Sequence, residues 1–484
     1  MSEVLRMLGR HSSEQGNAAA LFDGMITLTY SQLHQKVDEM AITLSEYSGQ
    51  CAGIELDNGI AWVLLDLACI KAGLVTIPLP AFFTDAQREH ALQSAGARLL
   101  FSYRPGGQAS LLTSNGQPIS IHLLDNSASK LPDGTTKITY TSGTTGEPKG
   151  VCLSQAGMEQ VATSLVKVLG QQAAVRTAAV LPLAILLENI AGCYATLLAG
   201  GCYDVRPQAS IGFGHGMIPD FVQLHDYLRD SAACSCILVP ELLRGLMQVS
   251  AESGHGLPAM GFIAVGGARV SAALLEQAEQ LGLPVYQGYG LSEAASVVSV
   301  NTPTANQCGS VGQCLPHLSV QIAKDGEILI QQPAFLGYVG ADETTAVLHT
   351  GDIGVLDEKG FLHITGRKKN IIINSMGRNI APEWPESELL AQPQIAQAIV
   401  IGDATTGLSA LLVPSAASIN ASQLAEAVTR TNLGLPEYAR IHHWQISAPF
   451  TLANKTLTGT GRPRRAAILD DCQKSQTNNI NSIA

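Results

Sequence analysis

Charged residues are scarce in this 484-residue chain. Lys, Arg, Asp and Glu make up 14% of it, against about a quarter in an average globular protein. Because disordered chains are rich in charge and poor in apolar residues, a chain with 46% hydrophobic residues is expected to fold over most of its length. Its 29 basic residues are outnumbered by 40 acidic ones, and no long run of Lys or Arg occurs. We therefore expect no nucleic-acid partner, since coating a nucleic acid requires many basic contacts.

Long uninterrupted apolar runs are also missing. A transmembrane helix needs about 20 apolar residues, whereas the two most hydrophobic stretches, 61–70 and 180–198, contain Asp66 and Glu188. The first fifteen residues include Glu3 and no continuous apolar core, which is not typical of a signal peptide. The sequence therefore predicts no integral membrane segment and no export.

The ten cysteines contain no CxxC pair, and only Cys234 and Cys236 lie close together. No zinc or redox motif is indicated. Reduced thiols in a cytoplasmic protein are the expectation.

Over the first 300 residues, short β-branched runs alternate with helical patterns. The strand-like runs include 50–56, 98–102, 137–140, 178–181, 235–240 and 261–265, and the helical patterns include 30–46, 60–72, 155–169, 190–199 and 272–281. Strand and helix in rotation predict an α/β fold with parallel-rich sheets covered by helices on both faces. The length exceeds what one hydrophobic core holds, so we expect at least two domains.

The pattern changes after residue 300. Short segments separated by Gly turns over 301–368 predict a small antiparallel β subdomain. A compact α/β pattern resumes over 369–471, and the polar residues 472–484 are expected to form a disordered tail. The predicted organisation is therefore a large N-terminal domain of αβ-layered sheets (1–300), the β subdomain, and a small C-terminal α/β domain.

The most informative segment is a strand at 138–141 that leads into a loop dense in Thr, Ser and Gly and closed by Lys149. Small residues let backbone N–H groups converge on phosphate oxygens, and the lysine adds a full positive charge. The segment is not the GxxxxGK[ST] loop, because no G-K-[ST] occurs in it. A GTTG fragment alone is equally typical of a polar turn, but the full string is far more specific. It predicts a phosphate-binding loop formed by Thr141, Ser142, Gly143, Thr144, Thr145, Gly146 and Lys149.

The string YTSGTTGEPKGV resembles the signature loop of the adenylate-forming (ANL) superfamily of AMP-binding enzymes, which includes acyl-CoA synthetases, adenylation domains of peptide synthetases and luciferases. Four further segments resemble family motifs and follow in the expected order, so the likeness covers nearly the whole chain. They are Gly266-Gly-Ala268, Gln287-Gly-Tyr-Gly-Leu-Ser-Glu293, Thr350-Gly-Asp352 and Gly366-Arg-Lys-Lys369.

The resemblance implies a role for each motif. The adenine is expected beside the backbone of Gly266, Gly267 and Ala268 and beside Tyr289, and Gln287, Gly288 and Gly290 are expected in the same ATP- and AMP-binding site. The α-phosphate is expected beside Ser292, the magnesium ion at Glu293 and Thr141, and the ribose at Asp352 and Arg367. The hinge between domains is expected at Lys369, and the thiol beside a loop that contains Gly377. The residue types suit these roles, since a carboxylate accepts two hydroxyl donors and offers the hard oxygen that Mg²⁺ prefers. Taken singly, T-G-D is also typical of a turn and Glu293 of the first turn of a helix.

The mechanism that the resemblance implies has two half-reactions. A carboxylate attacks the α-phosphorus of ATP, Mg²⁺ and Lys149 neutralise the departing pyrophosphate, and a thiol then attacks the acyl-adenylate. Because water would destroy the adenylate, the C-terminal domain is expected to act as a mobile lid that turns about the hinge between the half-reactions.

One position departs from the family pattern. Most adenylating members carry a C-terminal lysine that bridges the substrate carboxylate and the α-phosphate, whereas here one alignment places Arg462 there and another places Thr460. Arg462 keeps the charge but not the compact shape of an ammonium group, and Lys455 is an alternative if the loop is shifted. The Arg-rich segment is equally typical of a solvated basic turn.

A second departure from the family pattern concerns the pocket for the carboxylic acid substrate. Ile185 occupies a position where many relatives have His or an aromatic residue, and Glu188 lies where long-chain synthetases often have an acid. Both are expected in an apolar acyl pocket, although a buried core helix explains the same stretch.

The resulting prediction is an AMP-forming acid–thiol ligase of fatty acid metabolism that uses ATP, Mg²⁺ and a medium- or long-chain carboxylic acid, with CoA as the first choice of thiol. Three alternatives stay open. They are an acyl-AMP ligase that loads an acyl or peptidyl carrier protein through its phosphopantetheine, a β-lactone-forming adenylating enzyme, and a catalytically attenuated nucleotide-binding homologue.

Overall fold

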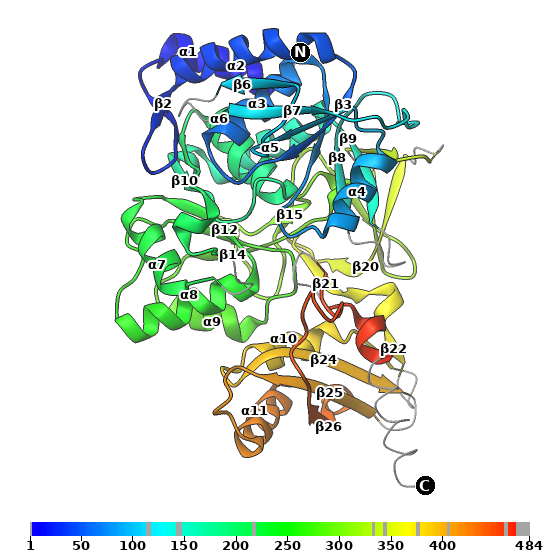
Figure 1. The fold of residues 1–484 in the computed structure, drawn as a ribbon. Coiled ribbons are helices and arrows are strands. Elements are labelled where there is room, and N and C mark those ends of the chain that lie inside the picture. Colours follow the sequence, from blue (N-terminus) through cyan, green and yellow to red (C-terminus); the bar gives the residue numbers. More distant parts are fainter. Residues whose placement is uncertain are drawn as a thin grey trace. The chain divides into compact units, whose positions relative to one another are not determined.

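The computed structural model describes residues 2–112, 118–141, 148–214, 219–331, 334–341, 346–373, 378–403, 407–458 and 463–470 (Figure 1). The chain divides into two compact units. The larger contains Met1–Val270, Leu275–Thr350 and Val355–His363, and the smaller contains Ser271–Leu274, Gly351–Gly354 and Ile364–Ala484. Each unit has its own hydrophobic core.

An eight-stranded sheet of the larger unit has the order β19-β9-β8-β4-β3-β5-β7-β6. Its central strands β8, β4, β3 and β5 are parallel, and antiparallel strands flank them on both sides. The strands are β3 (Cys51–Glu55), β4 (Val75–Pro78), β5 (Leu99–Ser102), β6 (Ala109–Leu112), β7 (Pro118–Leu123), β8 (Thr135–Thr141), β9 (Lys149–Ser154) and β19 (Phe335–Tyr338).

A nine-stranded sheet of the same unit has the order β16-β15-β14-β13-β12-β10-β11-β1-β2, and its strands from β14 to β1 are parallel. The strands are β1 (Ala19–Phe22), β2 (Thr27–Thr29), β10 (Arg176–Ala178), β11 (Cys202–Asp204), β12 (Ser235–Leu238), β13 (Phe262–Val265), β14 (Val285–Tyr289), β15 (Ser299–Val300) and β16 (Gln313–Cys314). Most of its pairs are therefore parallel, as the alternating pattern predicts.

Helices α2 (Tyr30–Leu44), α3 (Ile60–Ala72) and α5 (Gln155–Leu169) belong to one core cluster that takes side chains from strands of both sheets. Helix α3 is buried on nearly all sides, as its apolar sequence predicts. The opposite face of the eight-stranded sheet packs against α4 (Asp85–Ser94). Both faces of that sheet are thus covered, which confirms the predicted layering.

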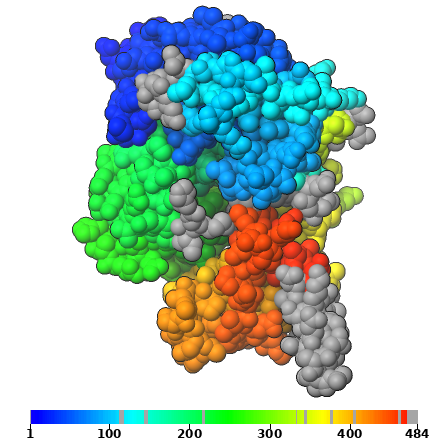
Figure 2. Space-filling view, viewed as in Figure 1, coloured from blue at the N-terminus to red at the C-terminus, as the bar shows by residue number. Residues whose placement is uncertain are grey.

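The remaining helices of the larger unit are α1 (Glu3–Glu14), α6 (Ala195–Ala199), α7 (Phe221–Asp230), α8 (Pro240–Ser253) and most of α9 (Ala272–Gln280). On the face shown in Figure 2, the N-terminal residues in blue and cyan and the residues in green form most of the visible surface of this unit. No helix in the described part of the chain is long and apolar enough to cross a membrane.

The first part of the helix predicted at 190–199 has a different helical geometry in the structure. A π-helix spans Leu187–Tyr194, and only Ala195–Ala199 is α-helical. The wider turn has a reason. Asn189 and Tyr194, five residues apart, both contact the ammonium group of Lys137, and in an α-helix residues five apart point to different faces.

Lys137 is the centre of a buried polar cluster. Its Nζ lies 2.9 and 3.1 Å from the two carboxylate oxygens of Asp66 on α3, 2.5 Å from Asn189 Oδ1 and 3.1 Å from the Tyr194 hydroxyl. Lys137 and Asp66 are both 1% exposed. Because a buried charge is tolerated only when it is fully paired, this cluster fixes β8 against α3 and the π-helix.

The region after residue 300 contains the predicted antiparallel strands. Strands β17 (Ser319–Ile322) and β18 (Glu327–Gln331) form a hairpin in a sheet of the order β17-β18-β20-β21. Strands β20 (Val347–Leu356) and β21 (Leu362–Arg367) contain the boundary between the two units.

The smaller unit has the predicted α/β composition. A three-stranded sheet, β24 (Ile395–Asp403), β25 (Gly407–Pro414) and β26 (Ile441–Ile446), contributes to its core together with α10 (Glu383–Leu390) and α11 (Ala421–Gly434). Short strands β22 (Ile372–Ile373) and β23 (Asn379–Ile380) precede it. The predicted tail 472–484 lies outside the described residues.

Candidate active site

The predicted phosphate-binding loop connects β8 to β9. The two strands are antiparallel, and Thr141 at the end of β8 is the partner of Lys149 at the start of β9. The structure therefore places both ends of the loop side by side. Ser142, Gly143, Thr144, Thr145 and Gly146 lie outside the described residues.

Helix α4 supports the base of this loop. His90 Nε2 lies 3.1 Å from the carbonyl oxygen of Pro148, the residue before Lys149. The His90 ring meets the ring of Tyr140 edge to face, and the Tyr140 hydroxyl lies 2.7 Å from Ser94 Oγ. These contacts hold the start of β9, and the sequence patterns did not indicate them.

The two segments predicted to contact adenine meet at the carboxyl ends of neighbouring parallel strands. Val265 at the end of β13 is the partner of Gln287 on β14. Gly266, Gly267 and Ala268 follow directly after β13, and Gln287, Gly288, Tyr289 and Gly290 lie at the end of β14. In open α/β sheets this edge is where ligands bind.

The chain makes a tight turn after β14. A Cβ on Gly290 would lie 1.6 Å from the carbonyl oxygen of Ser296, so only glycine fits. Ser292 and Glu293 stand in a short 3₁₀ turn, and Ala295 and Ser296 that follow have φ of 51° and 95°. Backbone in this left-handed region is costly for residues other than glycine and is common at functional sites.

A cluster of three side chains joins the phosphate loop to this turn. The Tyr338 hydroxyl donates a 2.9 Å hydrogen bond to Glu293 Oε1, and the Lys149 ammonium lies 5.4 Å from the centre of the Tyr338 ring. The sequence predicted Lys149 and Glu293 but missed Tyr338. Nothing in its local pattern, a Gly-Tyr pair after an apolar run, distinguishes it from an ordinary strand residue.

Burial and the nearby Glu293 carboxylate raise the pKa of Tyr338 well above its ordinary value. The hydroxyl therefore keeps its proton and acts as the donor. One oxygen of Glu293 is engaged in this way, and no second hydrogen-bond partner of its carboxylate occurs among the described residues.

The predicted ribose contacts lie together on β20 and β21. Asp352 is 3% exposed, and its Oδ1 lies 2.8 Å from Arg367 Nε. Thr350, two residues before Asp352, donates to the carbonyl oxygen of Ile328 at 2.8 Å. The T-G-D segment is thus part of a strand rather than an isolated turn.

The two residues predicted in the acyl pocket have different environments. Ile185 is partly exposed, whereas Glu188 is fully buried at the start of the π-helix. The Glu188 carboxylate accepts hydrogen bonds from the Tyr203 hydroxyl at 2.7 Å and from the Leu181 backbone N–H at 3.0 Å. Burial raises its pKa to about 7.

The predicted residues of the smaller unit are only partly described. Lys369 lies in a short 3₁₀ turn, Lys368–Asn370, and is exposed. Lys455 is exposed, with a φ of 60°. Gly377, Thr460 and Arg462 lie outside the described residues. Arg465, three residues after Arg462, forms a 2.5 Å ion pair with the buried Glu386.

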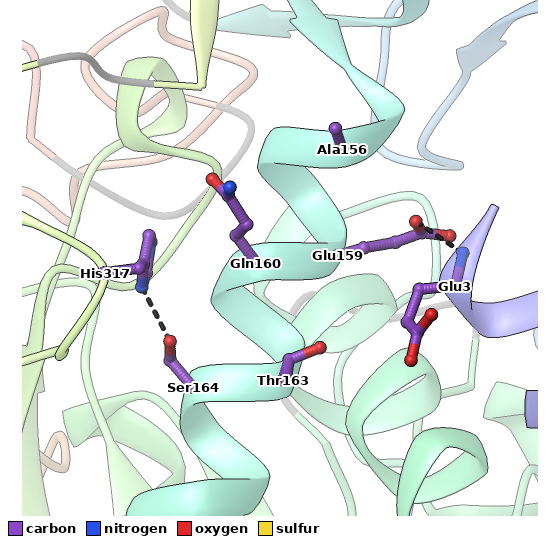
Figure 3. A pocket seen from close by; sticks show the side chains of 7 residues that line it. All are labelled: Glu3, Ala156, Glu159, Gln160, Thr163, Ser164 and His317. Atoms are coloured by element: carbon purple, nitrogen blue, oxygen red, sulfur yellow. Dashed lines mark hydrogen bonds between the residues drawn. The ribbon is translucent and has the colours of Figure 1, made fainter. Parts of the chain in front are cut away.

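An open hollow of about 370 Å³ lies along α5, and none of the residues predicted to form the active site lines it (Figure 3). Several of its polar groups hold neighbouring elements together. Ser164 Oγ lies 2.8 Å from His317 Nδ1, and the Glu159 carboxylate accepts the backbone N–H groups of Glu3 and Val4 at the start of α1. We assign it no ligand.

The residues of the site fit a magnesium ion held chiefly by substrate. Among the described residues, no group of three or more His, Cys, Asp or Glu side chains could hold a metal. Glu293, with one oxygen held by Tyr338, would supply the single carboxylate that Mg²⁺ needs when nucleotide phosphates provide the other ligands. Thr141 stands at the end of β8 on the loop.

Comparison with known proteins agrees with this geometry. Residues 8–339 match the AMP-binding enzyme family, and residues 369–477 match the AMP-binding enzyme C-terminal domain. The long-chain-fatty-acid–CoA ligase FadD15 of Mycobacterium bovis is 26% identical over 475 residues, covering 81% of this chain and 78% of that protein.

Two solved structures share the fold. The anthranilate CoA ligase AuaEII, in complex with anthranoyl-AMP, has a TM-score of 0.83 at 18% identity and covers 99% of this chain and 98% of its own. O-succinylbenzoate coenzyme A synthetase (MenE) of Bacillus subtilis, in complex with ATP and a magnesium ion, has a TM-score of 0.77 at 23% identity, with 95% and 98% covered.

The chain therefore belongs to the AMP-binding enzyme family, the adenylate-forming enzymes. The relative and the two solved structures named above are all CoA ligases or synthetases.

Proposed function

We propose that this enzyme activates a medium- or long-chain aliphatic carboxylic acid to its acyl-adenylate and transfers the acyl group to CoA. The observation that carries the proposal is the cluster of Lys149, Tyr338 and Glu293, in which one tyrosine contacts both a cation and a carboxylate. A cation beside a carboxylate that can bind Mg²⁺ is what displacement of pyrophosphate from ATP requires.

Each polar group has a task in adenylation. Lys149 neutralises charge that develops on the departing pyrophosphate, and Glu293 would hold Mg²⁺, which supplies Lewis-acid stabilisation of the phosphates when bound. Asp352 accepts the ribose hydroxyls, with Arg367 beside it. The ends of β13 and β14 flank the adenine, and Ser292 lies by the α-phosphate.

The choice of an aliphatic acid rests on Ile185. An apolar side chain at this position removes a polar or aromatic group from between the acyl and nucleotide pockets, and apolar contact favours an alkyl chain. FadD15 is named for long-chain fatty acids, whereas MenE and AuaEII are named for aromatic acids, so relatives of this fold differ in the acid. Glu188, buried with a partner on each oxygen, acts on the acyl pocket only through packing.

The replacement of the C-terminal lysine by Arg462 favours a second candidate, an attenuated nucleotide-binding homologue. In that case ATP binds but exchange with pyrophosphate is slow with every acid. Lys149, Glu293, Asp352 and Arg367 are all retained, which supports the active enzyme, because a protein that no longer adenylates has no need to keep metal and phosphate ligands.

Pyrophosphate exchange into ATP tests the proposal, with straight-chain acids of graded length set against benzoate and cinnamate. We expect acid-dependent exchange that is strongest with aliphatic acids. Addition of CoA should then give the acyl thioester, detected by mass, and addition of a phosphopantetheinylated carrier protein should give none. Exchange with aromatic acids alone contradicts the aliphatic assignment, and a β-lactone from a β-hydroxy acid contradicts the thiol acceptor.

A further inference from the structure

Tyr338 connects two groups that the proposed function uses. It lies on β19, which pairs antiparallel with β9, and Tyr338 is the partner of Val151. Lys149 precedes Val151 by two residues and so points to the same face of the sheet. A diagonal neighbour at this spacing is within reach of an aromatic side chain, which explains the 5.4 Å separation between the Lys149 ammonium and the ring centre.

A β-bulge in β19 turns the ring to this face. Phe335 pairs with Leu153 and Gly337 with Cys152, so one extra residue stands in β19. In a regular strand, residues three apart point to opposite faces. Here the rings of Phe335 and Tyr338 are in contact, with centres 4.8 Å apart. Gly337, with a φ of 138°, supplies the backbone conformation of the bulge.

The same face meets the turn that contains Glu293. Val151, Leu153, Phe335, Ala294 and Ala295 belong to one core cluster, with Tyr338 packed against it. Cys152, between the two β9 residues, belongs to the cluster on the opposite face. The core therefore holds the 3₁₀ turn of Glu293 against the strands that carry Lys149 and Tyr338.

We propose that Tyr338 is a positioning residue for adenylation: its hydroxyl orients the Glu293 carboxylate toward Mg²⁺, and its ring face holds the Lys149 ammonium beside it. The inference rests on the proposed function, because it takes Glu293 as the metal ligand and Lys149 as the phosphate contact. A hydrogen bond from the hydroxyl to one oxygen fixes the carboxylate and leaves the second oxygen for the ion. The ring attracts the lysine through its negative face.

The test is ATP binding by calorimetry, without acid, in EDTA and in saturating MgCl₂. The wild-type chain is compared with Tyr338→Phe, which keeps the ring and removes the hydroxyl. Tyr30→Phe is the matched control, since its hydroxyl donates to the Gly201 carbonyl at 2.7 Å in the buried core. Partners of metal ligands typically contribute about 10- to 100-fold to metal affinity.

We expect Tyr338→Phe to bind ATP as the wild type does in EDTA, within about two-fold, and to lose about ten-fold of the tightening that Mg²⁺ produces. Tyr30→Phe should keep both values. The positioning role is overturned if Tyr338→Phe binds ATP more weakly than the wild type by the same factor with and without Mg²⁺, or if Mg²⁺ tightens ATP binding equally in both proteins. A wild-type chain whose ATP affinity ignores Mg²⁺ overturns the proposed function itself, and this is seen before any variant is compared.

The ring is tested separately with pyrophosphate as the ligand. Tyr338→Phe should keep the wild-type affinity, and Tyr338→Leu should lose about five-fold, because only the latter removes the aromatic face from Lys149. Equal affinities for the Phe and Leu variants contradict this part of the inference. Circular dichroism of both variants checks that the fold is intact.

Discussion

At the scale of single residues, the proposed contact of Asp352 with the ribose of ATP is the simplest to test, because the Asp352 carboxylate is nearly buried and lies beside Arg367. Asp352→Asn should raise the dissociation constant for ATP about 10- to 100-fold, since hydrogen bonds to a charged group contribute about 1.5–3 kcal/mol. The sharper readout is 2′-deoxy-ATP. The wild type should bind it more weakly than ATP, and the Asn variant should bind the two nucleotides more nearly alike.

Asp357→Asn is a suitable control for this measurement. Asp357 accepts the backbone N–H groups of Lys359 and Phe361 in the turn after β20, so its loss affects the hairpin and not the ribose. If Asp352→Asn keeps the full preference for ATP over 2′-deoxy-ATP, the ribose assignment is wrong.

Glu188 predicts a pH dependence of stability. Burial raises its pKa from an ordinary 4.5 to about 7, so between these values the folded chain binds a proton that the unfolded chain releases. This contribution to the free energy of unfolding is present at pH 4.5 and lost as the pH rises through 7, by up to about 3 kcal/mol.

The measurement is urea unfolding of the wild type and of Glu188→Gln between pH 5 and 8. Other titrating groups cancel in the difference between the two proteins. The stability of the wild type relative to the Gln variant should fall as the pH rises. A relative stability that rises with pH shows that the folded chain prefers the charged carboxylate and contradicts the assignment.

At the scale of elements, the turn after β14 depends on Gly290. In Gly290→Ala, the new Cβ lies 1.6 Å from the Ser296 carbonyl oxygen, so the backbone that carries Glu293 must move. We expect pyrophosphate exchange to fall more than about ten-fold, because small displacements of catalytic groups are costly. Gly256→Ala is the control, since no atom lies within 4 Å of its added Cβ. Equal activities of the two variants would show that the turn tolerates displacement.

The buried Lys137–Asp66 ion pair is expected to contribute strongly to stability, because it joins β8 to α3 and the π-helix. Lys137→Met leaves the buried Asp66 carboxylate without its cationic partner, and the free energy of unfolding should fall by about 3–5 kcal/mol. Lys71→Met removes an exposed partner of Asp38 and should cost at most about 1 kcal/mol. Denaturant titration of both variants measures the contrast, and a similar small loss in each contradicts it.

Regular elements were predictable from sequence where one physical signal dominates. Helices α3 and α5 occupy the expected residues 60–72 and 155–169, because a continuous apolar run specifies the first, and apolar spacing and the Ser154 cap specify the second. The π-helix was not predictable, because its wide turn is set by the distant Lys137. Tyr338 was missed for the same reason, since positions 149, 293 and 338 meet only through the sheet and its bulge.

At the scale of the whole molecule, the chain consists of two units with separate cores. The segments that we propose to contact adenine and phosphate lie in the larger unit, and Asp352, Arg367 and Lys369 lie in the smaller. The family matches likewise end at residue 339 and resume at residue 369. We propose that Lys369 is the hinge between the half-reactions, so a substitution there is expected to affect thioester formation more than exchange.

The most direct test of the central claim is the identity of the nucleotide product when the enzyme turns over ATP, CoA and an acid that supports exchange. Chromatography of the reaction should show AMP and pyrophosphate formed in step with acyl-CoA. In Glu293→Gln the same products should form about 100-fold more slowly. Formation of ADP and phosphate, or of AMP without dependence on the acid, would contradict the account.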